Sequence, residues 1–256
     1  MRGRKWEYPQ NMATAKIHSR ETMGALDGPG IRYVLFMKGC PLRCAFCQNP
    51  DTWASAGGET LSARDAAADI LKYREFFDAS GGGFTASGGE PLLQPEFLAE
   101  LFSILKGAGV HRAIDTCGYV ELSESVKKAA RLASLVLLDI KHLDGAGHEK
   151  LTGKPNARVL EFLEFLSRED IPTHIRAVLI NGVSSGEEYI SRLANFLKKY
   201  PNVKRVDLLP YHDLGAKKWE ALGLRYRLGD SAFVPRQDAL RALEILQNAG
   251  LDATLQ

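Results

Sequence analysis

The stretch that decides the fold is KGCPLRCAFCQNPDTW, residues 38–53. It holds three of the chain's four cysteines, Cys40, Cys44 and Cys47, in a C-x3-C-x2-C spacing. It directly follows a short apolar run, IRYVLFM at 31–37, which predicts a buried strand. Thiols crowded in this way are typical of a metal or redox site, because a disulfide framework uses cysteines in pairs.

Four kinds of site could use this spacing. A structural zinc site normally takes four Cys or His ligands in two separated pairs, and no second pair follows here. A disulfide framework leaves an odd thiol, and a redox dithiol at Cys44 and Cys47 leaves Cys40 without a role. A four-iron cluster normally takes four thiolates, so three thiolates leave one iron open for a small molecule. We therefore favour an iron–sulfur cluster in which the missing fourth ligand is the functional feature.

The composition is that of an ordinary globular protein. The 256 residues are 45% hydrophobic and 25% charged, and 33 basic against 31 acidic residues give a net charge of +2. This balance argues against a dedicated nucleic-acid surface. No apolar run is long enough to cross a bilayer, and the N-terminal MRGRKWEYPQNM lacks the apolar segment of a secretory signal. We expect a cytoplasmic protein with no membrane partner.

Short apolar runs alternate with longer amphipathic stretches along most of the chain. This pattern predicts an α/β fold of βα units around a parallel sheet. A partial barrel and a doubly wound open sheet would produce the same pattern. The predicted strands are 31–37, 83–87, 111–116, 135–141, 173–180 and 203–210, and the predicted helices lie near 62–77, 95–107, 123–132, 157–168, 186–199 and 236–249.

Polar residues and glycines follow most of the predicted strands. Examples are Gly88-Gly89-Glu90, Asp115, Asp139 and the His212 of LLPYH. In barrel-type α/β folds the active site gathers at the carboxyl ends of the strands. The sequence therefore predicts that these side chains lie near the cysteine loop.

The cysteine spacing after a first strand resembles the hallmark of the radical S-adenosylmethionine (SAM) superfamily. The likeness is wider than the cysteines and covers nearly the whole chain from about Ala15. It extends to the family that activates glycyl radical enzymes, and in particular to the activators of pyruvate formate-lyase. The stretches that carry it are DGPGIRYVLFMKGCPLRCAFCQNPDTW (27–53), SGGGFTASGGEPLLQPEF (80–97), DTCGY (115–119), LVLLDIKHL (135–143), HIRAVLINGV (174–183) and LLPYHDLGAKKWEALG (208–223).

The resemblance implies a partial (β/α)6 barrel with outer helices. We expect one radical SAM domain at 15–256, preceded by a flexible extension at 1–14. It implies an oxidoreductase with a [4Fe-4S] cluster and SAM, which forms a glycyl radical on its partner and releases 5′-deoxyadenosine and methionine. The expected partners are pyruvate formate-lyase and an electron donor, flavodoxin or ferredoxin, and we expect a monomer.

The resemblance also assigns residues. Cys40, Cys44 and Cys47 would hold the cluster, and no catalytic side chain is expected beyond the cluster and SAM. A monovalent cation is expected near Asp115 and Asp139. Asp115 could instead cap a helix, and Arg176 could belong to a structural ion pair. The expected cofactor contacts are Phe46, Cys47, Gln48, Gly88, Gly89, Glu90, Asp115, Asp139, Ile140, Lys141, His142, Leu143, Arg176 and His212.

Some features depart from the family pattern. Cys117 stands where relatives often carry Asn, and a fourth thiolate there would block SAM, so we expect that Cys117 is not a ligand. Gln48 and Pro50 vary a loop in which relatives often have His and a basic residue. GAKKWEALG (215–223) and the N-terminal stretch are candidate partner contacts. The alternatives are an activator of a diol or glycerol dehydratase or of an anaerobic ribonucleotide reductase, and a non-catalytic Fe–S or zinc-binding module.

Overall fold

The computed structural model describes residues 12–256. The predicted N-terminal extension, 1–14, therefore lies almost entirely outside the described residues. From Thr14 onward a nine-stranded sheet runs through the chain in the order β3-β1-β2-β4-β5-β6-β7-β8-β9. The strands are β1 (Thr14–Gly24), β2 (Arg32–Met37), β3 (Glu59–Ser62), β4 (Gly83–Gly88), β5 (His111–Thr116), β6 (Leu135–Asp139), β7 (Thr173–Leu179), β8 (Val203–Pro210) and β9 (Ala253–Leu255).

The strand order decides between the two predicted architectures. β2, β4, β5, β6, β7 and β8 are neighbours in chain order, and every pair among them is parallel. A doubly wound sheet would reverse its order at one point, and this sheet does not. The sheet stays open, with β3 and β9 as its two edges. The predicted partial (β/α)6 barrel is confirmed, and all carboxyl ends of these six strands face one side.

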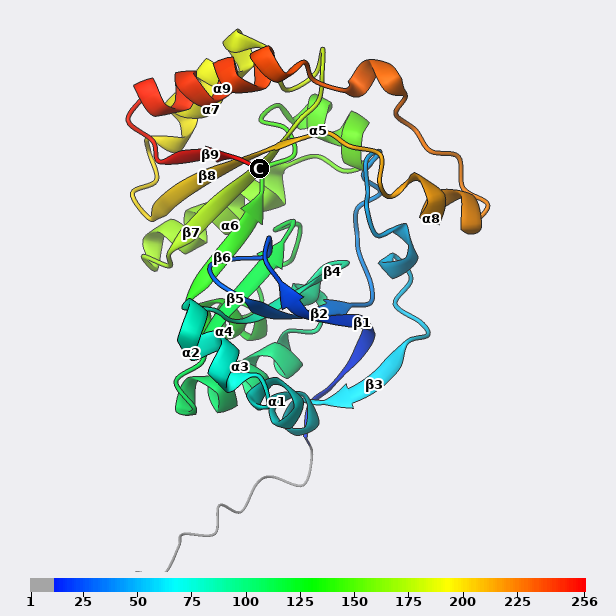
Figure 1. Cartoon of the computed structure of the whole chain (residues 1–256), viewed down its shortest axis with the longest axis vertical. Coiled ribbons are helices and arrows are strands. Elements are labelled where there is room, and N and C mark those ends of the chain that lie inside the picture. Colours follow the sequence, from blue (N-terminus) through cyan, green and yellow to red (C-terminus); the bar gives the residue numbers. More distant parts are fainter. Residues whose placement is uncertain (1–11) are drawn as a thin grey trace, which may run out of the picture.

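The helices lie mainly outside the curved sheet. Figure 1 shows α1 to α4 along its lower outer side, and α7 and α9 packed together at the top. Among the described residues, none of the helices has the length and apolar character needed to span a bilayer. They are α1 (Ala63–Leu71), α2 (Arg74–Ser80), α3 (Pro95–Gly107), α4 (Glu124–Leu132), α5 (Gly145–Thr152), α6 (Ala157–Arg168), α7 (Glu187–Leu197), α8 (Ala216–Ala221) and α9 (Arg236–Asn248).

Local sequence signals set several helix ends. Ser62 and Ser123 accept hydrogen bonds from the backbone N–H groups three residues later and so cap α1 and α4. Pro95 occupies the first turn of α3, where a missing N–H does no harm. Gly81 ends α2 with a left-handed backbone, φ 68°. These signals explain why the predicted helices lie close to the observed ones.

The predicted single helix over 62–77 was wrong. The chain breaks after α1, and Tyr73 at the break packs edge-on against Tyr33 of β2, with 5.3 Å between ring centroids. The antiparallel strand β1 was also missed. Only its first part alternates cleanly, because Ala15 and Ile17 are buried while the residues that follow are mostly exposed.

A second, smaller hydrophobic cluster lies apart from the main core. It contains Leu42, Cys44 and Phe46 of the cysteine loop together with Leu151 and residues from the last third of the chain. Figure 1 shows this loop, in blue, on the same side of the molecule as α8, in orange. Segments from both ends of the chain therefore build the surroundings of the cysteines.

Candidate functional site

The cysteine loop is held by backbone hydrogen bonds at both of its ends. Gly39 N–H donates to Thr52 O at 2.7 Å, and Cys40 N–H donates to Trp53 O at 3.2 Å. Farther along, Arg43 N–H and Ala45 N–H donate to the carbonyls of Thr152 and Leu151 at the end of α5. The backbone is therefore satisfied by neighbouring segments, and the thiols are left free for a ligand.

The loop closes one end of a cavity at the carboxyl ends of the strands. All three cysteines of the motif line it, as do most of the predicted cofactor contacts. The predicted residues that line it are Cys40, Cys44, Phe46, Cys47, Gln48, Gly88, Gly89, Asp115, Asp139, Lys141, Arg176 and His212.

Two of the three motif thiols, those of Cys44 and Cys47, are in a setting that disfavours an isolated thiolate. Burial raises the pKa of Cys44 to about 12 and also raises the pKa of Cys47. A hydrogen bond from Cys117 lowers the pKa of Cys40. Iron binds the thiolate, so metal binding would supply the charge that this apolar loop lacks. The residues present thus fit a cluster held by Cys40, Cys44 and Cys47.

The zinc alternative finds no support in the side-chain arrangement. Within residues 12–256, no three His, Cys, Asp or Glu side chains converge where one metal ion could bind them together. A structural zinc ion requires such convergence, because its ligands form one tetrahedron. A four-iron cluster instead takes each thiolate on a different iron, and this suits cysteines spread along a loop.

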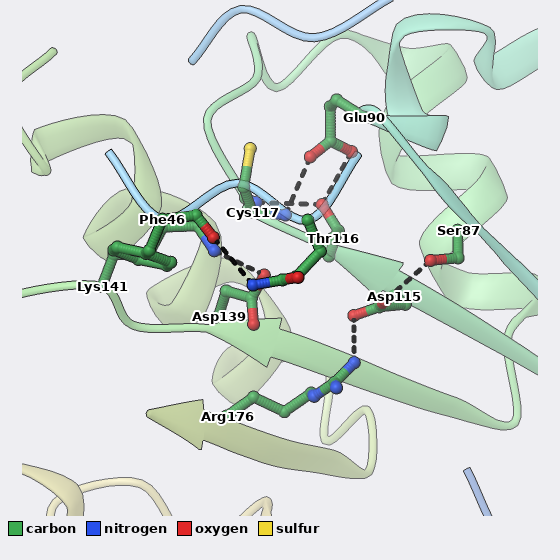
Figure 2. A network of polar contacts seen from close by, with 11 residues as sticks. Phe46, Ser87, Glu90, Asp115, Thr116, Cys117, Asp139, Lys141 and Arg176 are labelled. Atoms are coloured by element: carbon green, nitrogen blue, oxygen red, sulfur yellow. Dashed lines mark hydrogen bonds and ion pairs between the residues drawn. The ribbon is translucent and has the colours of Figure 1, made fainter. Parts of the chain in front are cut away.

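Cys117 lies in the same cavity, beside Cys40. Its backbone N–H donates to Glu90 Oε2 at 2.9 Å, and burial raises the pKa of its thiol. Glu90 is fully buried and also accepts from Thr116 Oγ1 at 2.7 Å and Leu92 N at 3.0 Å. Figure 2 shows its carboxylate directed at Thr116 and Cys117. The structure therefore gives Glu90 a bracing position and does not place it in the cavity lining.

The glycine pair after β4 lets two backbone segments meet closely. A Cβ at Gly88, where φ is 113°, would lie 2.2 Å from Met37 N. A Cβ at Gly89 would lie 2.2 Å from Gly39 O and 3.3 Å from Cys40 Cβ. Because neither glycine has a side chain, this backbone fits directly against the end of β2 and the start of the cysteine loop. The predicted contact of Gly88 and Gly89 with SAM stays a prediction.

Asp115, near the end of β5, and Arg176, in the middle of β7, form an ion pair. Arg176 Nη1 lies 3.0 Å from Asp115 Oδ1, and Ser87 Oγ donates to Asp115 Oδ2 at 2.7 Å (Figure 2). Arg176 Nε is buried and has no hydrogen-bond partner among the described residues, and Asp115 Oδ1 has no partner there besides the Arg176 guanidinium. An acceptor and a donor so placed fit the ammonium and carboxylate of an amino-acid ligand.

A third acidic group is close to this pair. Burial and the nearby Asp115 carboxylate raise the pKa of Asp27 to about 6. The Asp115 carboxylate also raises the pKa of Arg176 further above its ordinary value, against the effect of burial. Asp27 belongs to DGPG (27–30), which the sequence analysis noted only as part of the resemblance to the family.

Asp139 and Lys141 form the second ion pair of the cavity. Lys141 Nζ lies 2.8 Å from Asp139 Oδ2 and 5.4 Å from the centroid of the Phe46 ring. Burial opposes the charge of Lys141, but Asp139 and the Cys44 thiol raise the pKa of Lys141 above its ordinary value. A fixed positive charge therefore lies next to both the aromatic ring and the cysteine loop.

The remaining predicted contacts divide into two groups. Gln48 Nε2 donates to His212 O at 3.0 Å, which links the cysteine loop to the end of β8. Ile140 packs in the main core, and His142 lines a separate surface cavity. The side chains of Ile140, His142 and Leu143 are not in the lining of the cysteine cavity, so any part they take there would be through the backbone.

Several lining residues were not predicted. Ser87 orients Asp115, and Asn49, Trp53 and Tyr211 also line the cavity. Ser87 and Tyr211 each stand next to a predicted residue at a strand end, in TASGG and LLPYH. Trp219, whose Nε1 donates to Cys47 O at 2.9 Å, is 172 residues away along the chain. Nothing in the local sequence could have shown that contact.

Comparison with known proteins agrees with this site. Residues 34–197 match the family model of the Radical SAM superfamily. A pyruvate formate-lyase-activating enzyme of Listeria monocytogenes is 49% identical over 218 residues, covering 83% of this chain and 88% of the relative. Those of Clostridium pasteurianum and Staphylococcus aureus (strain USA300) are 46% and 43% identical, covering 86% and 90% of this chain and 91% and 94% of theirs.

Solved structures show the same fold. A domain of a pyruvate-formate lyase-activating enzyme from Bacteroides vulgatus superimposes with a TM-score of 0.57 at 32% identity, over 69% of this chain and 99% of that one. SuiB of Streptococcus suis, solved with S-adenosylmethionine, gives a TM-score of 0.63 at 17% identity, over 85% of this chain and 48% of that one. At that identity the second likeness concerns the fold alone.

Proposed function

Because the chain belongs to the radical SAM superfamily and, within it, to the pyruvate formate-lyase-activating enzymes, we propose that it places a glycyl radical on pyruvate formate-lyase. Its cofactors are a [4Fe-4S] cluster and SAM. When bound, the cluster supplies the electron that cleaves SAM to methionine and a 5′-deoxyadenosyl radical, which takes a hydrogen atom from a glycine of the partner. The observation that carries this proposal is the meeting of three motif cysteines and two ion pairs in one cavity.

Cys40, Cys44 and Cys47 would hold the cluster. Cys44 is 7% exposed and lies among apolar side chains, so water has little access to this part of the loop. Exclusion of water protects a radical from side reactions. In this proposal Cys117 is not a cluster ligand. Its backbone is bonded to Glu90, and it supports the cysteine loop at Cys40.

The two ion pairs would hold the polar end of SAM. Asp115 Oδ1, which already pairs with Arg176 Nη1, can accept a further hydrogen bond from the ammonium group, and Arg176 Nε offers an unused donor to the carboxylate. Gly88 and Gly89 also line the cavity, so their backbone would lie beside the ligand. Lys141, Phe46 and His212 complete the lining around it. The monovalent cation beside Asp115 and Asp139 remains a prediction, because each carboxylate already has a cationic neighbour.

The other parts of the proposal concern partners and setting. Residues 15–256 act as one catalytic domain, which works as a monomer in the cytoplasm and receives its electron from flavodoxin or ferredoxin. The four cysteines are free, a state typical of a reducing compartment. The glycine of the partner would enter through the open side of the barrel.

The decisive experiment uses anaerobically reconstituted protein with SAM, a reductant and purified pyruvate formate-lyase. We expect 5′-deoxyadenosine to form together with a glycyl doublet in the electron paramagnetic resonance (EPR) spectrum. If deoxyadenosine forms without a doublet, the chain cleaves SAM but does not activate pyruvate formate-lyase. Dehydratases and ribonucleotide reductases would then be tested as partners. If protein with a full complement of iron forms neither deoxyadenosine nor the doublet, the proposed enzymatic function is wrong and the binding-module alternative is left.

A further inference from the structure

Three chain segments meet on the outer side of the cysteine loop. Arg227, in the segment that follows α8, donates from Nη1 to Arg43 O at 3.0 Å and from Nη2 to Lys150 O at 3.2 Å. Arg43 lies within the cysteine loop, and Lys150 lies in α5. Figure 1 shows the orange segment after α8 beside the blue loop. This surface is therefore the outer wall of the proposed cluster site.

The segment 225–228 has one face toward the site and one toward solvent. Tyr226 and Leu228 are partly buried and pack on the small hydrophobic cluster that contains Cys44. The Tyr226 ring lies 5.4 Å from that of Trp219, whose Nε1 donates to Cys47 O. Arg225 and Arg227, which alternate with them, are exposed. The Arg227 guanidinium holds two backbone carbonyls, and the Arg225 side chain makes no hydrogen bond with another described residue.

Positive charge gathers here without acidic partners. We call Arg43, Lys150, Lys154, Arg225 and Arg227 the basic face. All five are exposed, and none forms an ion pair with another residue of the part of the chain that the structure describes. Glu149 is the acidic residue next to Lys150.

Some exposed arginines elsewhere do have acidic partners. Arg131 pairs with Glu169 and Arg192 pairs with Asp144. The net charge of the chain is only +2, so the overall composition does not explain this local excess of positive charge. It reflects how the charged residues are placed on the surface. Unpaired charge of one sign attracts a partner of the opposite sign and speeds its association.

We propose that the basic face docks an acidic one-electron carrier protein of the flavodoxin class, which reduces the cluster from the outer side of its loop. This inference rests on the proposed function, since an electron acceptor must lie behind the loop. One electron leaves the carrier's reduced flavin, which is oxidised by one electron, and the cluster is reduced by one electron. No proton moves and no bond forms or breaks. Docking here brings the carrier to the wall built by Cys44 and Cys47.

The test reverses charge on the basic face without loosening the loop. The triple variant Lys150→Glu/Lys154→Glu/Arg225→Glu changes side chains that make no hydrogen bond with another described residue. Arg43 and Arg227 are kept, because their guanidinium groups hold backbone carbonyls. The matched control, Lys128→Glu/Lys198→Glu/Lys199→Glu, makes the same change of charge at exposed lysines on α4 and at the end of α7.

Binding of a purified flavodoxin to the cluster-loaded chain is measured under anaerobic conditions at several salt concentrations. We expect the triple variant to bind about tenfold more weakly than the wild type and with a shallower salt dependence. The control should stay within about twofold. Equal weakening in both variants, or in neither, would overturn the proposal, as would loss of pyruvate formate-lyase binding with flavodoxin binding intact.

A second measurement separates this proposal from the function on which it rests. With dithionite as the reductant, SAM cleavage and the EPR signal of the reduced cluster should be the same in the wild type and in both variants. If the wild type gives no 5′-deoxyadenosine with dithionite, the proposed function fails, and the binding constants still decide whether the basic face docks flavodoxin. If only the triple variant fails with dithionite, the charges support the site itself and the docking proposal is wrong.

Discussion

The four cysteines of the cavity differ in burial and in contacts, although three of them belong to one motif. Cys44 is packed among apolar side chains, while Cys40 and Cys47 are partly exposed at the cavity. Cys117 has the burial of a core residue, and its backbone is tied to Glu90. Because the buried Glu90 carboxylate fixes the backbone of Cys117, the Cys117 thiol is placed to support its neighbour Cys40 and not to move toward a metal.

Replacement of single thiols tests this division. We expect Cys44→Ala to lose the cluster, because two thiolates cannot hold it, and with it all SAM cleavage. Cys117→Ala should keep both, with a stability loss of about 1–2 kcal/mol from the small cavity it leaves. Iron content, visible absorption and 5′-deoxyadenosine yield measure the outcome. A Cys44→Ala protein that retains cleavage, or a Cys117→Ala protein that lacks iron, would contradict the ligand assignment.

The acid stability of the fold depends on His111 at the start of β5. Its Nδ1 lies 3.2 Å from Nη1 of Arg32, which is fully buried, and burial together with Arg32 lowers the pKa of His111 to about 4. Between pH 6.5 and 4 the unfolded chain therefore takes up a proton that the folded chain refuses, so the free energy of unfolding falls as the pH falls. Because His111 is partly exposed, we expect a loss of about 1–2 kcal/mol over this range.

The variant His111→Asn isolates that effect. Asparagine offers Arg32 an acceptor oxygen and cannot take up a proton. Denaturant unfolding at pH 7, 6, 5 and 4 should therefore show a shallower decline for the variant than for the wild type. Parallel curves for the two proteins would mean that His111 does not titrate across this range.

At the scale of the elements, the site depends on how closely the turn that follows β4 fits the end of β2. Glu90 N–H donates to Gly39 O at 2.7 Å, and Gly89 N–H donates to Met37 O at 2.9 Å. In Gly89→Ala the new methyl group would collide with Gly39 O, 2.2 Å away, and push on Cys40. We expect a destabilisation of about 1–3 kcal/mol and a lower iron content after reconstitution.

Gly107→Ala is the control for that substitution. Gly107 ends α3, and a Cβ there meets no atom within 4 Å. Alanine should therefore leave the iron content unchanged and raise stability by about 0.5–1 kcal/mol, because it restricts the unfolded chain. If both variants load iron equally well, the close contact at Gly89 does not position the cysteine loop.

The elements also show what sequence patterns can and cannot predict. All six parallel strands were predicted to within a few residues, because each contains a short apolar stretch, and several of these stretches end in glycine or aspartate. β1 and the short strands β3 and β9 were missed, since β1 is largely exposed after Ile17 and the two edge strands have only four and three residues. The residues at strand ends were predicted to share a site, and the structure brings most of them together. The inward turn of Glu90 follows from packing, which no spacing reveals.

At the scale of the whole molecule, the last third of the chain holds the first third in place. Trp219 Nε1 donates to Cys47 O, and its ring lies 5.0 Å from Trp53 and 5.4 Å from Tyr226. Lys218 Nζ donates to Asn49 Oδ1 at 2.7 Å, next to the same loop. Together with the hydrogen bonds from the loop to the end of α5, these long-range contacts should control the opening of the loop.

Two variants of Trp219 test this bracing role. Trp219→Phe keeps an aromatic ring and removes the N–H donor, whereas Trp219→Ala removes both. Since one hydrogen bond contributes about 0.5–1.5 kcal/mol and burial of a large ring contributes more, we expect loop opening to rise a few-fold in the first variant and much further in the second. Hydrogen exchange at residues 40–50 measures it directly, and exchange in β5 and β6 serves as the internal reference. Faster exchange everywhere would indicate general destabilisation, and unchanged exchange at 40–50 would show that the cysteine loop is stable without its brace. Exchange that rises at 40–50 alone would mean that the C-terminal segment sets how firmly the cluster is held, because opening this loop exposes the thiols to chelators and oxidants.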